Sequence, residues 1–173
     1  GLTAGTVVTP NGVAGSFTVT ATTAGGGSPA VFSLINTKRN PTVTLAISPN
    51  PAAYNAALTL TATVTTTLGE GIDPLTGNVV FTDTTNVINT SSALASGSAV
   101  VCVNAVPAGI YTVTATYGGD ATHLPGEATA TVQVLPAPLP PQARADVAAV
   151  LQDTPLLIDV LANDMPGTSQ QLT

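Results

Sequence analysis

Threonine alternates with apolar residues in four separate stretches of the chain, and this alternation limits what the chain can fold into. The stretches are 42–47, 58–65, 111–117 and 128–134. A period of two places the apolar residues on one face of an extended segment and the threonines on the other. Threonine suits a solvated strand face, because its branched Cβ fits the pleated backbone and its hydroxyl stays hydrated. The pattern predicts half-buried β-strands and no long helix.

Turn-forming residues separate these stretches. Clusters of glycine, proline, aspartate and asparagine, which favour turns, occur at 48–51, 68–71, 73–77, 107–109 and 118–120. Shorter strands are predicted at 79–82, 87–89 and 99–103. About seven short strands separated by regular turns are typical of a β-sandwich. The fold class expected is therefore all-β.

The chain also contains an internal repeat. The segment AGSFTVTAT at 14–22 returns as AGIYTVTAT at 108–116, an offset of 94 residues. Residues 6–8 match 100–102 at the same offset, and 30–34 resemble 130–134 at a similar one. This period is about the length of one immunoglobulin-like sandwich of roughly 100 residues.

The repeat predicts tandem immunoglobulin-like sandwiches. We expect a complete sandwich at 41–135 and a proline-rich linker at 136–142, a composition that favours extended, semi-rigid spacers. Residues 1–37 are expected to be the C-terminal strands of one domain, and 143–173 the N-terminal strands of another. On this interpretation the terminal domains are incomplete in this window, and the segment comes from a longer array.

The charge content excludes several classes of function. The chain of 173 residues has only three Lys and Arg and a net charge of −6, so it cannot neutralise a nucleic-acid backbone. No run of 18 apolar residues predicts a membrane-spanning helix. We expect no signal peptide within these residues. A single cysteine provides no disulfide framework.

Catalytic groups are few. The chain has one His, one Cys and nine carboxylates, and no nucleophile–base or carboxylate pair stands in a recognisable motif. We therefore predict no enzyme, no catalytic, cofactor-binding or metal-binding residues and no cofactor. Asp120 is interpreted as a turn residue that binds its own backbone two residues on. His123 is interpreted as a loop side chain over the end of the sandwich, and Cys102 as a buried or half-buried inert thiol.

Three other positions have structural interpretations. Tyr111 begins a late strand and resembles the tyrosine corner of sandwiches. Lys38 could form an isopeptide cross-link only from inside a core, whereas it lies in the polar link 37–41. Residues 89–91 form an Asn-Thr-Ser glycosylation pattern, to which we assign no function.

The order of several segments also carries a family resemblance. The segments SPNP, LTLTATV, TGNVVF, PAG and YTVTATYGGD follow one another at 48–51, 58–64, 76–81, 107–109 and 111–120. This order resembles the bacterial Ig-like repeat domains of large surface and secreted proteins. Residues 1–37 resemble the last strands of a related repeat. The segment DTPLLIDVLAND at 153–164 resembles the opening of a cadherin-like bacterial repeat.

The resemblance implies tandem arrays on cell surfaces, in adhesins, in filaments or in accessory modules of secreted enzymes, and no catalysis. We expect a structural segment of an extracellular or cell-surface protein. The alternative is a carbohydrate- or receptor-binding accessory module, although the chain has only six Phe and Tyr and no Trp. Cadherin-like repeats often add further calcium-binding aspartates, whereas Asn163 and Asp164 are followed by neutral residues, a poor ligand set for a hard cation.

The expected partners follow from the incomplete ends. A partial sandwich exposes an apolar face and unpaired strand edges. Neighbouring repeats of the same chain, or other copies of it, are expected to cover them. The apolar segment 156–161 is predicted to be a strand and a candidate donor for β-strand addition. A surface glycan or receptor remains an open alternative.

Overall fold

A computed structural model describes residues 13–67 and 73–168 of the chain. These residues contain nine β-strands and no helix. The repeat member 6–8 and the predicted turn at 68–71 lie outside the described residues. The strands are β1 (Gly15–Ala21), β2 (Ala30–Asn36), β3 (Thr42–Ser48), β4 (Leu58–Thr65), β5 (Asn78–Asp83), β6 (Asn89–Ala93), β7 (Ser98–Val103), β8 (Gly109–Tyr117) and β9 (Gly126–Val134).

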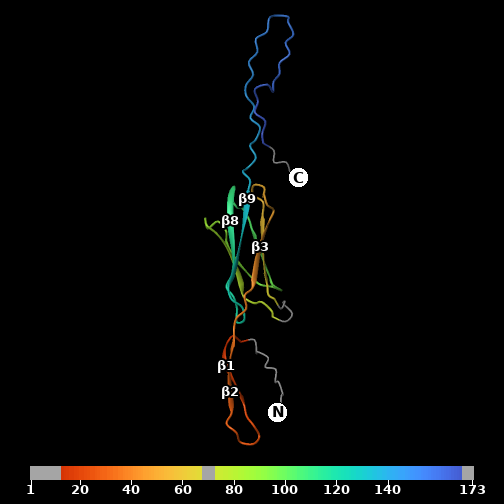
Figure 1. Ribbon diagram of the computed structural model, residues 1–173. Helices are drawn as coiled ribbons and strands as arrows, with labels where there is room; N and C mark the ends of the chain where they lie inside the picture. Colours follow the sequence, from red (N-terminus) through yellow and green to blue (C-terminus); the bar gives the residue numbers. More distant parts are fainter. Residues whose placement is uncertain (1–12, 68–72, 169–173) are drawn as a thin grey trace.

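Strands β3 to β9 form a sandwich of two antiparallel sheets (Figure 1). One sheet has the order β3-β4-β7 and the other the order β6-β5-β8-β9. The predicted all-β sandwich is confirmed. In β4, for example, Leu58 and Leu60 are completely buried, while the intervening threonines are only partly covered. Phe81 and Tyr117 are the largest completely buried side chains of the core.

The predicted strand at 87–89 is wrong, because the structure places β6 at Asn89–Ala93. Asp83 closes the preceding turn, with its carboxylate accepting hydrogen bonds from the N–H of Thr85 at 2.9 Å and of Ile88 at 2.7 Å. This carboxylate supplies the local partners that a strand neighbour would otherwise provide. Pairing with β5 therefore begins only at Asn89.

Residues 49–52 run beside the free edge of β9. The N–H of Ala52 donates to Gln133 O at 2.8 Å, and the N–H of Leu135 donates to Ala52 O at 2.9 Å. The side chain of Asn50 adds a bond to Thr131 O and accepts one from the N–H of Gln133. These bonds satisfy backbone groups at an edge that would otherwise be open.

Strands β1 and β2 form a separate hairpin with the same register as β8 and β9. Phe17 pairs with Leu34 as Tyr111 pairs with Val132. Strand β1 therefore corresponds to β8 at an offset of 94 residues, and β2 to β9 at an offset of 98. The sequence match of 30–34 with 130–134 differs from this structural register by two residues. Because side chains alternate between the faces of a strand, a shift of two residues leaves each side chain on the same face.

The described residues after the sandwich, 136–168, contain no strand. The strand predicted at 156–161 is therefore wrong, whereas the further domain expected at 143–173 stays a prediction. A strand needs a neighbour for its N–H and C=O groups, and the pairing observed here is one isolated bridge between Gln142 and Met165. Leu157 is 97% exposed.

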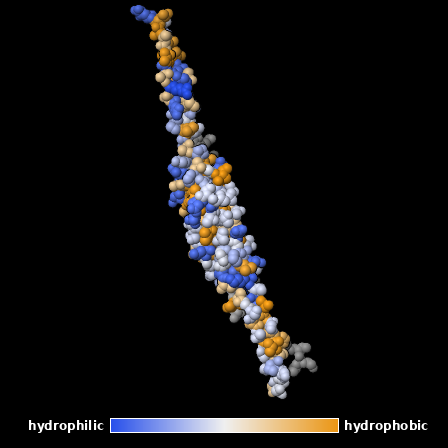
Figure 2. Space-filling model, turned by 90° about the vertical axis from the view of Figure 1, so that its left-hand side faces the viewer, coloured by the Kyte–Doolittle hydropathy of each residue, from blue (hydrophilic) through white to orange (hydrophobic). Residues whose placement is uncertain are grey.

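The molecule is elongated (Figure 1). The hairpin lies at one end, the sandwich in the middle and residues 136–168 at the other end, so the chain enters and leaves the sandwich at opposite poles. Figure 2 shows apolar patches along both narrow ends, whereas the wider sandwich is mostly pale or hydrophilic. The threonine-bearing outer faces of the strands account for that difference.

Candidate functional site

A cluster of charged side chains lies at the pole where the chain enters the sandwich. It contains Arg39 from the link 37–41, Asp73 from the segment before β5, and Asp120 and His123 from residues 118–124, here called the pole loop. His123 is completely buried and Asp73 is 5% exposed. Four charged or polar side chains from three parts of the sequence therefore meet in one place.

His123 lies between two carboxylates. Its Nε2 is 2.8 Å from Asp73 Oδ2, and its Nδ1 is 2.9 Å from Asp120 Oδ1. An ionised carboxylate only accepts hydrogen bonds. Each ring nitrogen therefore faces a carboxylate oxygen, and the two carboxylates fix the orientation of the imidazole ring.

Asp120 holds the pole loop together through both of its oxygens. Oδ2 accepts from the N–H of Thr76 at 3.0 Å, and Oδ1 accepts from the N–H groups of Thr122 and His123, each at 2.8 Å. Burial raises the pKa of Asp120, but these hydrogen bonds outweigh burial and hold the pKa well below its ordinary value.

Asp73 connects the histidine to the link. Its Oδ2 forms an ion pair with Arg39 Nη1 and also accepts the bond from His123 Nε2. Burial raises the pKa of Asp73, and the hydrogen bonds from Arg39 and His123, together with their charges, lower it by more. The net direction is downwards, so both carboxylates are ionised at neutral pH.

Glycine at position 119 allows the tight turn of the pole loop. Its φ is +81°, and a Cβ there would lie 2.8 Å from His123 O, so an L-residue would be strained and would clash. Tyr117, at the end of β8, donates from its hydroxyl to Thr76 O at 2.9 Å. The loop and the segment before β5 are therefore fixed to each other by neutral bonds as well.

The contacts within the cluster indicate a structural role. Backbone N–H groups of the protein donate to both oxygens of Asp120, and each ring nitrogen of His123 faces a carboxylate. Within 13–67 and 73–168, no three His, Cys, Asp or Glu side chains are placed to share a metal ion. The hydroxyl of Thr122 lies 3.0 Å from His123 Nδ1 and also donates to Asp120 Oδ1 at 3.1 Å.

The sequence interpretation of Asp120 is confirmed, because its side chain binds the N–H of Thr122, two residues on. His123 does lie at the end of the sandwich, but the sequence interpretation missed its two carboxylate partners. Asp73 was read only as part of a turn, 50 residues away in the sequence. The only sequence signal was the short spacing of Asp120 and His123, three residues apart, and it did not identify the second carboxylate.

The expectation for Cys102 is wrong, because its thiol is exposed. It lies on the outer face of β7 with Val100, 3.8 Å from Thr59 Oγ1. The structural role of Tyr111 is confirmed: its hydroxyl donates to Pro107 O, four residues upstream, at 3.0 Å. Lys38 is exposed, and its Nζ donates to the backbone O of Asp120. Asn89 is exposed at the start of β6.

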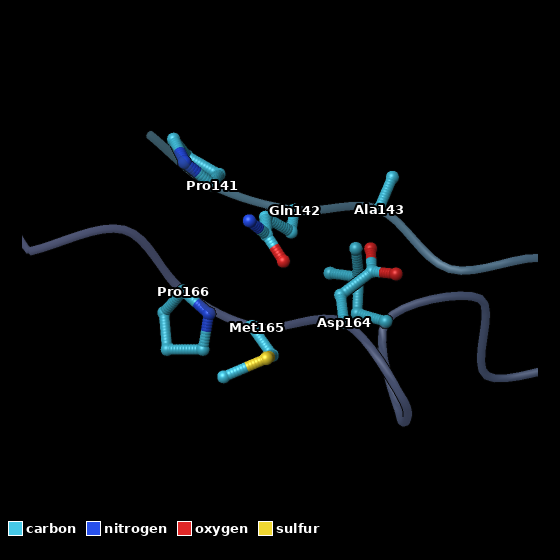
Figure 3. A pocket seen from close by; sticks show the side chains of 7 residues that line it. Pro141, Gln142, Ala143, Asp164, Met165 and Pro166 are labelled. Carbon is cyan, nitrogen blue, oxygen red and sulfur yellow. The ribbon is translucent and has the colours of Figure 1, made fainter. Parts of the chain in front are cut away.

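An open groove of about 480 Å³ lies between two extended segments near the C-terminal end (Figure 3). Asp164 faces this groove, but its Oδ1 already accepts the N–H of Arg144 at 2.8 Å. Asn163 donates to Ala145 O at 3.2 Å. The residues that line the groove are Pro141, Gln142, Ala143, Leu161, Asp164, Met165 and Pro166.

Within the described residues, none of the elements is a helix long and apolar enough to cross a membrane. Two comparisons with known proteins bear on the identity of the chain. A search of curated proteins found no match. A family model described as bacterial Ig-like domain (group 3) matches residues 43–135, a span that covers β3 to β9 almost completely.

Proposed function

The chain belongs to the bacterial Ig-like domain family, since the family model covers more than half of it, and on that premise we propose that it is a structural segment of an extracellular repeat protein. Domains of this family are structural modules with a non-catalytic type of fold. The specific proposal is that this segment acts as a spacer in a stalk, filament or adhesin. Its place is outside the cell or on the cell surface.

One observation carries the proposal. The chain enters the sandwich at Thr42 and leaves it at Val134, at opposite poles of an elongated molecule (Figure 1). A domain with this connectivity adds its length to an array. The polar cluster at the entry pole consists of groups that bind one another, which fits a spacer better than a reactive centre.

The exposed hairpin supports a neighbouring repeat as the partner. Phe17, Val19, Phe32 and Leu34 lie on one face of the hairpin, and Phe32 is 56% exposed. In the β8–β9 hairpin, which has the same register, the equivalent residues Tyr111, Val113 and Val132 are buried against the opposite sheet. We propose that strands of another Ig-like repeat cover the β1–β2 face in the same way.

Small-angle X-ray scattering of the 173-residue chain tests the spacer proposal. The expected result is a rod-like particle whose longest dimension grows by a constant step when a second copy of 41–135 is fused after the first. A compact particle, or no increase in length on fusion, would contradict the proposal. Sedimentation at several concentrations separates the two possible partners, because only pairing with a second copy of the chain depends on concentration.

A binding module is the second candidate. Tyr54 is 43% exposed beside the pole where the chain leaves the sandwich, and an exposed aromatic ring could stack on a sugar. Three of the six Phe and Tyr, namely Phe81, Tyr111 and Tyr117, are instead buried in the core. A glycan array probed with the chain and with Tyr54→Ala distinguishes the candidates. Binding that Tyr54→Ala abolishes would favour the module, and the spacer proposal predicts no binding. The spacer proposal also predicts no turnover with common hydrolase substrates.

A further inference from the structure

The link 37–41 is bound to the sandwich along its own backbone. The N–H of Arg39 donates to Thr122 O at 2.9 Å, and the N–H of Leu124 donates to Arg39 O at 2.8 Å. Arg39 and His123 thus form a short parallel bridge between the link and the pole loop. Next to it, Lys38 Nζ reaches the backbone O of Asp120. Five residues between two folded parts would otherwise form a hinge.

Charged and polar side chains surround this bridge. The guanidinium of Arg39 faces the carboxylate of Asp73, and His123 lies between the carboxylates of Asp73 and Asp120. Two of the chain's three Lys and Arg lie in this one link. Asp73 and His123 are buried, and a buried charge is tolerated when it is paired and hydrogen-bonded. Removing Arg39 would take the guanidinium charge away from Asp73, whose Oδ2 would still face His123 Nε2.

We propose that Arg39, Asp73, His123 and Asp120 form a charge clasp that fixes the link onto the pole loop, so that the joint between the β1–β2 hairpin and the sandwich is stiff. The side chain of Arg39 reaches across the loop to Asp73, and the backbone of Arg39 bonds to the loop on both sides. The link therefore has one preferred orientation on the sandwich.

The second link differs in where it is bound. After Leu135, the N–H of Leu139 donates to Thr168 Oγ1 at 3.0 Å, and Gln142 exchanges backbone hydrogen bonds with Met165. These bonds join the proline-rich linker to the C-terminal segment. This inference concerns the joint itself and does not depend on the spacer function.

Amide hydrogen exchange by NMR on the full 173-residue chain tests the clasp. The two reporters are the amides at positions 39 and 124, and the amide of Val113 in the core of the sandwich reports on global unfolding. In the unmodified chain, both reporters are expected to be protected relative to their intrinsic exchange rates. In Arg39→Ala, we expect their protection to fall at least tenfold while the protection of Val113 is unchanged.

Arg144→Ala is the matched control, because it removes the remaining arginine at a site outside the sandwich. It is expected to leave both reporters unchanged. Reporters that are unprotected in the unmodified chain would overturn the proposal. So would an Arg39→Ala variant in which their protection is unchanged, because the backbone bonds would then hold the link without the clasp.

A distance measurement gives a second, independent readout. Spin labels at Ser33 on β2 and Thr112 on β8, both exposed, are introduced in a Cys102→Ser background. A stiff joint predicts a narrow distance distribution that broadens in Arg39→Ala. The melting temperature of the same samples shows whether the sandwich is intact. A broad distribution before the mutation, or no broadening after it, would refute a stiff joint.

Discussion

Replacing Asp120 by asparagine is expected to destabilise the sandwich strongly, although the change in shape is minimal. Asparagine keeps one acceptor oxygen and replaces the other with an NH₂ donor. In the less costly orientation, the oxygen keeps the N–H groups of Thr122 and His123, and the NH₂ group faces the N–H of Thr76. One backbone donor then has no partner, and the buried imidazole ring loses one of its two carboxylate partners.

The expected cost can be worked from these two losses. An unsatisfied donor costs about 1–3 kcal/mol, and the loss of the carboxylate beside His123 Nδ1 adds to this cost, although Asp73 still faces the other ring nitrogen. We therefore expect a loss of about 3 kcal/mol from the free energy of unfolding, a large part of the ~5–15 kcal/mol of a typical domain. For a domain of this size, that loss corresponds to a fall in melting temperature of at least about 10 °C.

Urea denaturation at pH 7, followed by circular dichroism, measures this loss. Asp146→Asn is the matched control, because Asp146 is exposed and the substitution makes the same change in charge outside the sandwich. The control is expected to stay within about 0.5 kcal/mol of the unmodified chain. Equal stabilities for Asp120→Asn and Asp146→Asn would show that the carboxylate does not organise the pole loop.

Three further predictions concern the same structure. Gly119→Ala is expected to lower the melting temperature, because the φ of Gly119 is +81° and an added Cβ would meet His123 O. Gly118→Ala is expected to be tolerated, because a Cβ at Gly118 would meet open space. Equal melting temperatures for the two variants would contradict this prediction. The pKa values of Asp73 and Asp120 are lowered on folding. The two ionised carboxylates therefore stabilise the folded state above the ordinary aspartate pKa of about 3.9, and this stabilisation is lost as the pH falls below that value. A urea midpoint that stays constant from pH 7 down to about pH 2 would refute that sign. The exposed thiol of Cys102 is expected to react with a thiol reagent at the rate of a free cysteine in the native protein, and slow labelling that urea accelerates would contradict its exposure.

The strands were predictable wherever one of the two alternating sets is polar. In β4 the threonines mark the outer face, so the buried set is unambiguous. In β7 both sets are apolar: Ala99, Val101 and Val103 point one way, and Val100 and Cys102 the other. The two-residue period of the sequence assigned these residues to the correct two sets. Which set is buried depends on the position of the opposite sheet, which the strand sequence does not contain. The exposure of Cys102 could not be derived from the strand alone.

The candidate cluster could not be predicted from the sequence for a different reason. Asp73 and His123 are 50 residues apart in the sequence, and no local pattern connects them. The wrong strand at 156–161 shows the complementary limit, since an apolar segment is able to pair as a strand but cannot supply the neighbouring strand. The boundaries of the domains at the two ends stay predictions for the same reason.

The short parallel contact between residues 50–52 and the end of β9 has a mechanical consequence. A pull on the two ends of the molecule acts along β9, because the chain enters at one pole and leaves at the other. The hydrogen bonds that join Asn50 and Ala52 to Thr131, Gln133 and Leu135 lie across that direction. Tension therefore shears these four bonds together, and the sandwich resists it until all of them give way at once.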